Sequence, residues 1–281
     1  MPETKTLLTG LGIPESPRWH EDRLWFCNWI DRQIVAVDLD GKYEAIPVDL
    51  AHPMGYSIEW LPDGRLLMTG DKLRRREPDG SMAVHSEQGG NEIVVSARGN
   101  IYVNGADFAF ASGEPPKPGY IRLITPSGEV REVAGDIQFP NGMVITPDDR
   151  TLIISESFAG RLTAFDIDED GGLSNRRVFA EDLGPDGICL DAEGAVWVSH
   201  GGTGVVRVAE GGRILDRVEL PEHRAPFAVM LGGPDLTTLF ILTAEWHQAD
   251  GVVDNLTRLT TGPRTGEILT LPVTVPGAGR P

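Results

Sequence analysis

The sequence predicts an all-β fold, a six-bladed β-propeller of four-stranded antiparallel blades. One layout recurs six times: a polar or special residue, an apolar strand, a turn and a second apolar strand. The repeats start roughly 35 to 50 residues apart, which is the spacing of propeller blades. The 34 glycines and 21 prolines are spread along the 281 residues, as many short strands joined by turns require. Continuous helical periodicity is absent, which argues against alternating strands and helices.

The six units begin with segments that align with one another: Glu15-Ser16-Pro17-Arg18-Trp19, Tyr56-Ser57-Ile58-Glu59-Trp60, Asn91-Glu92-Ile93-Val94-Val95, Asn141-Gly142-Met143-Val144-Ile145, Asp186-Gly187-Ile188-Cys189-Leu190 and Phe227-Ala228-Val229-Met230-Leu231. Turns such as Pro62-Asp63-Gly64-Arg65 follow them, where glycine supplies the positive φ of a tight hairpin. Residues 1–281 are predicted to form a single propeller domain. The leading segment 4–8 is expected to add an outer strand to the last blade, beside residues 268–271, which closes the ring. A sandwich with a similar number of strands is the alternative.

The first residue of each unit occupies an equivalent place, the axial start of the innermost strand. Around the ring these residues are Glu15, Tyr56, Asn91, Asn141, Asp186 and Phe227. Carboxylates crowded there repel one another, and unpaired burial is costly, so a cation would resolve the conflict. Oxygen ligands without His or Cys favour Ca²⁺, with Mg²⁺ or Mn²⁺ as alternatives and Zn²⁺ if waters complete its shell. The other interpretation is that these residues only cap strands and plug the axis with hydrogen bonds.

The composition narrows the class of partner. The net charge of -17, without a large Lys/Arg cluster, disfavours binding to nucleic acid or to an anionic membrane. Cys27 and Cys189 each lie in an apolar strand-like run and are expected to be buried free thiols. No signal sequence or membrane-spanning run is visible, so we expect a cytoplasmic protein, a monomer or small homo-oligomer.

Four segments, in this order and spacing, resemble a known family: Pro14-Glu15-Ser16-Pro17-Arg18-Trp19, Pro140-Asn141-Gly142, Leu173-Ser174-Asn175-Arg176-Arg177 and Pro185-Asp186-Gly187-Ile188-Cys189-Leu190-Asp191-Ala192-Glu193-Gly194. Over nearly its whole length the chain resembles the SMP-30/gluconolactonase/luciferin-regenerating-enzyme family, whose members are metal-dependent lactone hydrolases on six-bladed propellers. The resemblance implies one divalent metal ion held by Glu15, Asn141 and Asp186. It also implies that Asn91 lies beside the metal and contacts the substrate.

The loops that follow the second strands are expected to surround the mouth of the site. They carry Trp29, Asn104, Phe108, Phe110, Phe158, His200, Trp246 and His247. Lactone hydrolysis needs a metal to polarise the carbonyl and a base to activate water, and Asp186 is the predicted base. Asn91 and Asn104 are predicted to orient the substrate, Tyr56 and Phe227 to form apolar walls, and His200 or His247 to assist proton transfer.

The stretch before the third innermost strand departs from the family pattern. Some sugar-lactonase members carry an Arg and an Asn-Asp pair there, whereas this chain reads Gln88-Gly89-Gly90-Asn91-Glu92. The missing Arg and the aromatic mouth favour a more apolar lactone or ester than gluconolactone. Two alternatives stay open: another reaction on a cyclic or carbonyl substrate at the same metal site, and a non-enzymatic calcium-binding propeller.

Overall fold

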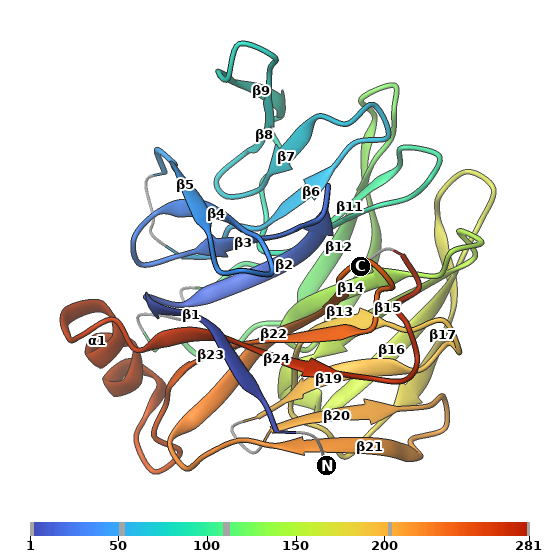
Figure 1. Cartoon of the computed structure of the whole chain (residues 1–281). Coiled ribbons are helices and arrows are strands. Elements are labelled where there is room, and N and C mark those ends of the chain that lie inside the picture. The colour runs from blue at the N-terminus through green and yellow to red at the C-terminus, as the bar shows by residue number, and fades with distance from the viewer. Residues whose placement is uncertain (1–2, 51–53, 109–112, 202–203, 280–281) are drawn as a thin grey trace.

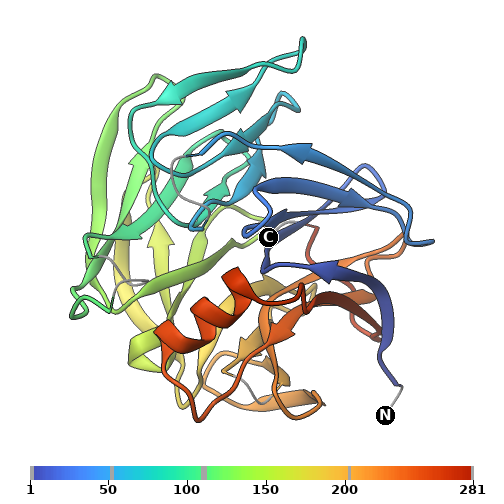
Figure 2. The same cartoon turned by 90° about the vertical axis from the view of Figure 1, so that its left-hand side faces the viewer.

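Six antiparallel sheets of four strands each surround one axis (Figures 1 and 2). The computed structural model describes residues 3–50, 54–108, 113–201 and 204–279. Within this part of the chain the predicted all-β propeller is confirmed. The blades follow one another in sequence, and each runs from the axis outward.

The first three blades contain the following strands, innermost first. Blade 1 has β2 (Pro14–His20), β3 (Arg23–Asn28), β4 (Gln33–Val37) and β5 (Tyr43–Pro47). Blade 2 has β6 (Ile58–Trp60), β7 (Leu66–Met68), β8 (Leu73–Arg76) and β9 (Met82–Ser86). Blade 3 has β10 (Ile93–Val95), β11 (Ile101–Ala106), β12 (Gly119–Ile124) and β13 (Val130–Ile137).

The other three blades follow the same order. Blade 4 has β14 (Pro140–Ile145), β15 (Thr151–Glu156), β16 (Arg161–Ile167) and β17 (Leu173–Ala180), with the short 3-10 helix η2 (Ser157–Ala159) after β15. Blade 5 has β18 (Pro185–Leu190), β19 (Val196–His200), β20 (Gly204–Val208) and β21 (Ile214–Glu219). Blade 6 has β22 (Arg224–Gly232), β23 (Thr238–Glu245), β24 (Gly266–Pro272) and β1 (Lys5–Leu11).

Apolar side chains fill the space between neighbouring blades. Val144 and Ile153 of blade 4, for example, share one buried cluster with Val198 and Val206 of blade 5. The innermost strands contact those of the neighbouring blades around the ring, so β2 packs against both β6 and β22. The hairpin turns use the expected chemistry: Gly64 has φ +81°, and Asp63 Oδ1 accepts a hydrogen bond from Arg65 N at 3.1 Å. The ring therefore fixes the axial ends of six strands relative to one another.

The two ends of the chain meet in blade 6. Strand β1 pairs antiparallel with β24, with Lys5 opposite Thr270 and Thr6 opposite Leu269. Leu11 is 5% exposed and belongs to the core cluster of this blade. The predicted closure is confirmed, and it pairs the edge of β24 that would otherwise be open.

One element was not predicted. The connection between β23 and β24, expected to be a long loop, contains the helix α1 (Val252–Thr261), which lies in front of blade 6 in Figure 2. Its sequence is rich in Val, Thr and Asn, which are weak helix formers, and Gly251 gives it no side-chain cap. Tertiary contacts hold the helix instead: Leu259 is buried against Ile13 and Ala244. Helix propensity alone therefore does not predict α1.

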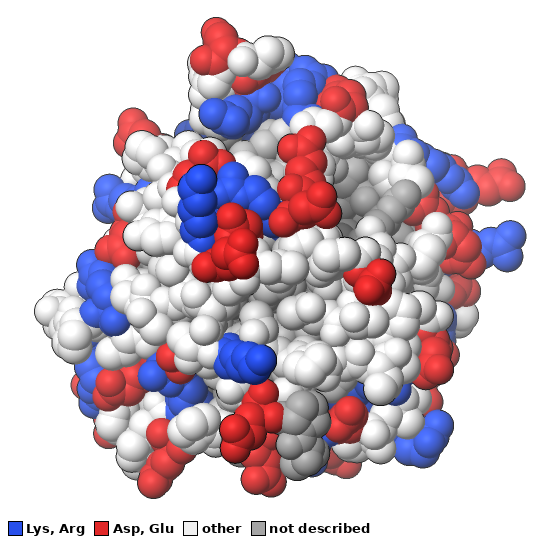
Figure 3. All heavy atoms as spheres, viewed as in Figure 1, with Lys and Arg blue, Asp and Glu red and all other residues white. Residues whose placement is uncertain are grey.

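Cys27 and Cys189 are both buried and free, as expected. Acidic and basic side chains are interspersed on the face shown in Figure 3, and the basic ones form no extended patch there. Within the described ranges, no helix is both long and apolar enough to cross a membrane.

We predict that deleting residues 1–11 destabilises the protein strongly, because it removes β1 and exposes the edge of β24. The loss exceeds the about 2–5 kcal/mol of truncating one buried leucine. Thermal unfolding and light scattering measure it, and deletion of residues 1–4, which leaves β1 intact, is the control. Equal melting temperatures for the two deletions would contradict a closing role for β1.

Candidate active site on the propeller axis

A β-bulge positions the ring residue in four of the six blades. The strand register shifts between Glu15 and Arg18 in blade 1, Pro140 and Met143 in blade 4, Pro185 and Ile188 in blade 5, and Pro226 and Ala228 in blade 6. A proline stands directly before the ring residue in each case, at a strand start or bulge where no ladder N–H is required. A bulge re-aims a side chain locally, so these strands turn their ring residues out of the regular pleat.

Glycines bring the Asn141 and Asp186 strands into close contact. A Cβ on Gly142 would lie 2.8 Å from Ile188 N and 2.9 Å from Asp186 O. A Cβ on Gly187 would lie 2.5 Å from the Cβ of Ala228 in blade 6. Only glycine allows this approach, which explains the Asn-Gly and Asp-Gly pairs of the repeats. The side chain of Asn141 lies close enough to Asp186 to lower the pKa of that carboxyl.

Asn104 fixes the Asn141 backbone from blade 3. It is fully buried, its Nδ2 donates to Asn141 O at 2.7 Å, and its Oδ1 accepts from Glu92 N at 3.3 Å. Both ends of the amide are therefore used within the protein. Direct contact of Asn104 with a substrate stays a prediction, whereas its structural role is to position the ring.

Carboxylates from three blades converge near the axis. Burial, followed by repulsion from Asp186 and Glu92, raises the pKa of Glu15 well above its usual range. Burial, followed by repulsion from Glu92, raises the pKa of Asp186 to about 8, against the opposing hydrogen bond with Asn141. The fold therefore places Glu15 and Asn141 near Asp186, and their joint role as metal ligands stays a prediction.

The donor set fits a hard cation. Asp186 Oδ1 is buried without a hydrogen-bond partner, and such an atom costs free energy unless something else binds it. The three predicted ligands offer only oxygen, which suits Ca²⁺ or Mg²⁺. No group of three His, Cys, Asp or Glu side chains able to hold a metal is found in the described ranges. A cation held here would therefore require an amide oxygen, such as that of Asn141, in addition to the carboxylates.

A buried ion network beside the ring was missed from the sequence. Arg18 Nε lies 2.8 Å from Glu59 Oε2, Arg18 Nη2 lies 3.9 Å from Glu92 Oε2, and all three side chains are buried. Burial raises the pKa of Glu92 to about 7, and the charge of Arg18 opposes this rise. A signal was present: Arg18 and Glu59 hold the same fourth position in the first two repeat units. Opposite charges at equivalent places in neighbouring innermost strands predict a pair.

Aromatic residues cover the mouth above blades 6 and 1. Trp246 meets Phe227 edge-on at 5.8 Å between ring centroids, and both pack against the cluster of Ile13 and Leu259 beneath α1. Trp29 Nε1 donates to Tyr56 O at 2.7 Å. The Tyr56 ring is fully buried, and its hydroxyl contacts the carbonyls of Asn28 and Gln33.

The other predicted mouth residues lie farther around the rim. Phe158 is 49% exposed and stacks on Phe139 at 4.3 Å, and Phe108 contacts the same ring. Phe110 falls outside the described residues. His200 Nδ1 accepts from Gly184 N at 3.0 Å, and burial lowers its pKa.

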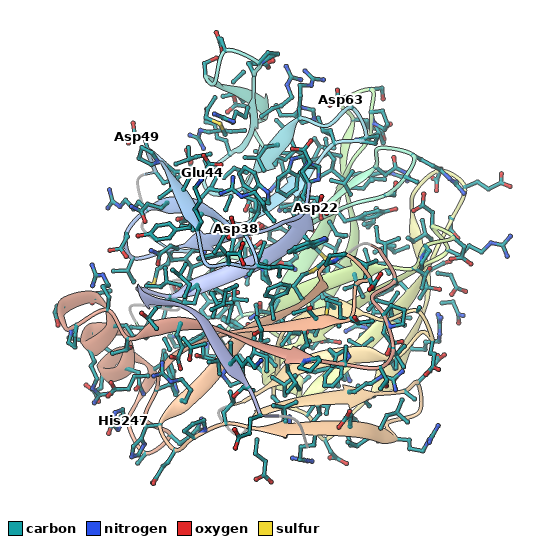
Figure 4. All side chains as sticks on the ribbon, in the orientation of Figure 1. Asp22, Asp38, Glu44, Asp49, Asp63 and His247 are labelled. Atoms are coloured by element: carbon teal, nitrogen blue, oxygen red, sulfur yellow. The ribbon has the colours of Figure 1, made fainter. Side chains whose placement is uncertain are left out.

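His247 lies at the edge of the molecule on the side of α1 (Figure 4). Its Nε2 is 2.6 Å from Glu245 Oε1, and its ring stacks on His223 with 4.3 Å between centroids. These contacts engage His247 within the rim of blade 6. A role for either His200 or His247 in proton transfer stays a prediction.

A cavity of about 530 Å³ opens between blades 2 and 3. Tyr56 and Asn91 line it on the axial side, and polar side chains that include Gln88 and Arg122 line it farther out. The mouth is therefore not uniformly aromatic, and the expected preference for an apolar substrate has no support on this side. The backbone of Asn91 is fixed on two sides, since its N–H donates to Asn104 O at 2.7 Å and its carbonyl accepts from Thr69 Oγ1 at 3.0 Å.

Fold and site together define a six-bladed propeller with a polar, oxygen-rich site at one end of its axis. The model of the SMP-30/gluconolactonase/LRE-like region matches residues 13–245, and the chain belongs to this family.

Relatives and a solved structure agree with this membership. The chain is 28% identical over 260 residues to a pentonolactonase of Haloferax volcanii, an alignment that covers 87% of this chain and 86% of the relative. It is 31% identical over 170 residues to a 6-deoxy-6-sulfogluconolactonase of Pseudomonas putida, covering 58% and 56%. A calcium-binding regucalcin from Agrobacterium tumefaciens has the same fold, with a TM-score of 0.80 and 23% identity over 100% of this chain and 97% of that one.

We predict that Gly142→Ala destabilises the protein by about 1–3 kcal/mol, since the added methyl group overpacks the contact between blades 4 and 5. It should also weaken binding of Ca²⁺, because Asn141 and Asp186 are pushed apart. Urea unfolding and calcium titration measure both effects. Gly135→Ala on the outer strand β13, where the nearest atom is the end of the flexible Glu132 side chain, is the control. A stable variant with unchanged calcium affinity would contradict this packing argument.

A second prediction concerns pH. The raised pKa of Asp186 means that folded, metal-free protein retains a proton that the unfolded chain loses, between the ordinary value of 3.8 and about 8. Stability of chelator-treated protein therefore falls as pH rises through this window, and added Ca²⁺ restores more stability at pH 8 than at pH 5. Asp186→Asn should flatten the fall and reduce the calcium effect. Thermal unfolding from pH 5 to 9 tests this, and identical profiles for the two proteins would contradict it.

Proposed function

We propose that this protein is a metal-dependent hydrolase that opens a small lactone or ester. The observation that carries the proposal is the buried, unpartnered Asp186 Oδ1, with Glu15 and Asn141 near enough to shift the pKa values, in a chain that belongs to this family. Two of the relatives reported above are named as lactonases, which supports a lactone as the substrate.

The ion is proposed to be Ca²⁺, held by Glu15, Asn141 and Asp186 with waters completing its shell, because the protein ligands are all oxygen. When bound, it supplies positive charge that polarises the carbonyl and stabilises the developing oxyanion. Glu15 and Asp186 would hold the ion in their ionised forms, because its charge would offset the repulsion between them.

The proton transfer and the orientation of the substrate are carried out by protein side chains. Asp186 accepts a proton from the attacking water while the water oxygen bonds to the carbonyl carbon. The ring C–O bond then breaks, and the leaving oxygen takes that proton back from Asp186 to become a hydroxyl, so the product is a hydroxy acid and the base is regenerated. Among the described residues, the Asn91 side chain has no hydrogen-bond partner, whereas its backbone is held on two sides, and the residue lines the cavity. It orients the substrate. Trp246 and Phe227 exclude water on the opposite side.

A pH-indicator screen of aliphatic, aromatic and sugar lactones, with and without chelator, tests this function. Asp186→Ala should lower kcat/KM by at least about 100-fold, the usual contribution of a positioned base. Asp40→Asn, an exposed carboxylate in a turn of blade 1, is the matched control and should keep full activity. Loss of activity on chelation should reverse when Ca²⁺ is added.

The result of this screen also distinguishes the hydrolase from the alternative functions. No turnover of any lactone, combined with a large loss of stability on chelation, would replace the hydrolase with a calcium-binding propeller. Turnover that Asp186→Ala leaves unchanged would remove Asp186 from the mechanism.

A further inference from the structure

The cavity between blades 2 and 3 extends outward from the axis. Asn91 and Tyr56 lie at its inner end, while Tyr120 and Arg122 of β12, the third strand of blade 3, line it farther out. Two strand spacings separate β10 from β12, roughly 10 Å between backbones. A molecule that reacts at the axis can therefore reach this end only with a substituent several bonds from its reacting carbonyl.

Contacts with neighbouring side chains fix the position of the Arg122 guanidinium. Its guanidinium stacks over the Tyr120 ring with 3.8 Å to the centroid, and its Nη1 donates to Gln88 Oε1 at 2.9 Å. Gln88 is itself fixed, because its Nε2 donates to Gly89 O at 2.6 Å. The side chain of Arg122 is 29% exposed, so part of it faces the solvent-filled space. A guanidinium stacked and pinned in this way loses little freedom when it binds a ligand.

The charge of Arg122 is weakly compensated. Within the part of the chain that the structure describes, Arg122 forms an ion pair with Glu132, a long one of 3.9 Å from Nε to Oε2 of a side chain that is 53% exposed. The acids that line the same cavity have nearer cations of their own. Asp71 binds Arg74 at 2.6 Å, and Glu87 binds Lys72 at 2.6 Å. Arg122 is therefore the charged side chain of the cavity wall whose N–H groups remain available to bind a ligand.

The backbone explains why the cation comes from β12. A Cβ on Gly89 would lie 2.1 Å from Gly70 O, and a Cβ on Gly90 would lie 2.4 Å from Asn104 O. No side chain fits at either place, so positions 89 and 90 cannot supply a cation to this cavity. Gly105 leaves room opposite, since a Cβ there would lie 3.0 Å from the Tyr120 hydroxyl.

We propose that Arg122 binds a negatively charged substituent, a carboxylate, sulfonate or phosphate, at the far end of the lactone and thereby determines specificity. This inference rests on the proposed function, and it narrows the substrate class to anionic lactones. Guanidinium and these anions form paired, charge-assisted hydrogen bonds, which a neutral hydroxyl does not offer. In a chain with a net charge of -17, such a substrate needs a local cation to be held.

The test compares D-glucono-1,5-lactone with its 6-phosphate and its 6-deoxy-6-sulfo analogue, after subtraction of spontaneous hydrolysis. The native protein should prefer the two anionic lactones. Arg122→Gln should lower kcat/KM for them about 10- to 100-fold, mainly through KM, as expected for the loss of charged hydrogen bonds. The neutral lactone should change less than about twofold, because Arg122 is remote from the reacting carbonyl.

Two control variants accompany Arg122→Gln. Arg122→Lys keeps the charge without the paired donors and should fall between the native protein and Arg122→Gln. Arg150→Gln removes the same charge from a side chain that is 82% exposed and outside the cavity, and it should leave the preference unchanged. Equal losses on neutral and anionic lactones, or no preference in the native protein, would overturn the inference.

Calorimetric binding of 6-phosphogluconate and gluconate keeps the two proposals separable. Tighter binding of the phosphorylated acid, lost in Arg122→Gln, supports the role of Arg122 even in a protein that opens no lactone. Lactone turnover without any dependence on Arg122 would reject this inference and leave the hydrolase intact. If the protein neither opens any lactone nor binds 6-phosphogluconate more tightly than gluconate, both proposals are rejected.

Discussion

Mutual repulsion among the buried carboxylates Glu15, Glu92 and Asp186 is the constraint to which the axial region of this propeller is adapted. They come from three different blades, and burial raises the pKa of each. Protein side chains compensate only part of this negative charge. Arg18 lies between Glu59 and Glu92 and offsets their charge, whereas Asp186 Oδ1 is left without a partner. A bound cation would complete the compensation, and chemistry at the axis would then follow from the same charge.

Close backbone packing makes that arrangement possible. Gly142 and Gly187 let the innermost strands of blades 4, 5 and 6 approach until almost no space remains between them, and the buried Asn104 ties blade 3 to Asn141. A rigid ring of this kind holds ligands from separate blades in fixed relation. Helix α1 and the connecting loops lie outside the ring of innermost strands. They form apolar, partly aromatic contacts beside α1, and the polar cavity lies between blades 2 and 3.

Much of the fold and the ring was predictable because the repeats are visible in the sequence. Equivalent positions in repeats become neighbours around an axis, so Glu15, Asn141 and Asp186 were predicted together and the fold does bring them together. The same alignment places Arg18 and Glu59 at one repeat position, and their opposite charges are the signal for the buried ion pair. Helix α1 was not predictable from propensity, since packing of Leu259 and hydrogen bonds of Asn255 with His247 hold it.

The sequence by itself determined the six blades, their closure by β1 and the identity of the axial ring, because each depends on a pattern that recurs along the chain. Only the tertiary structure decided which other residues share the site. Arg122 lies 31 positions after Asn91, with β11 between β10 and β12 in the sheet, yet both residues line the same cavity. Contacts of this kind depend on how blades pack against one another, and no local spacing in the sequence encodes them.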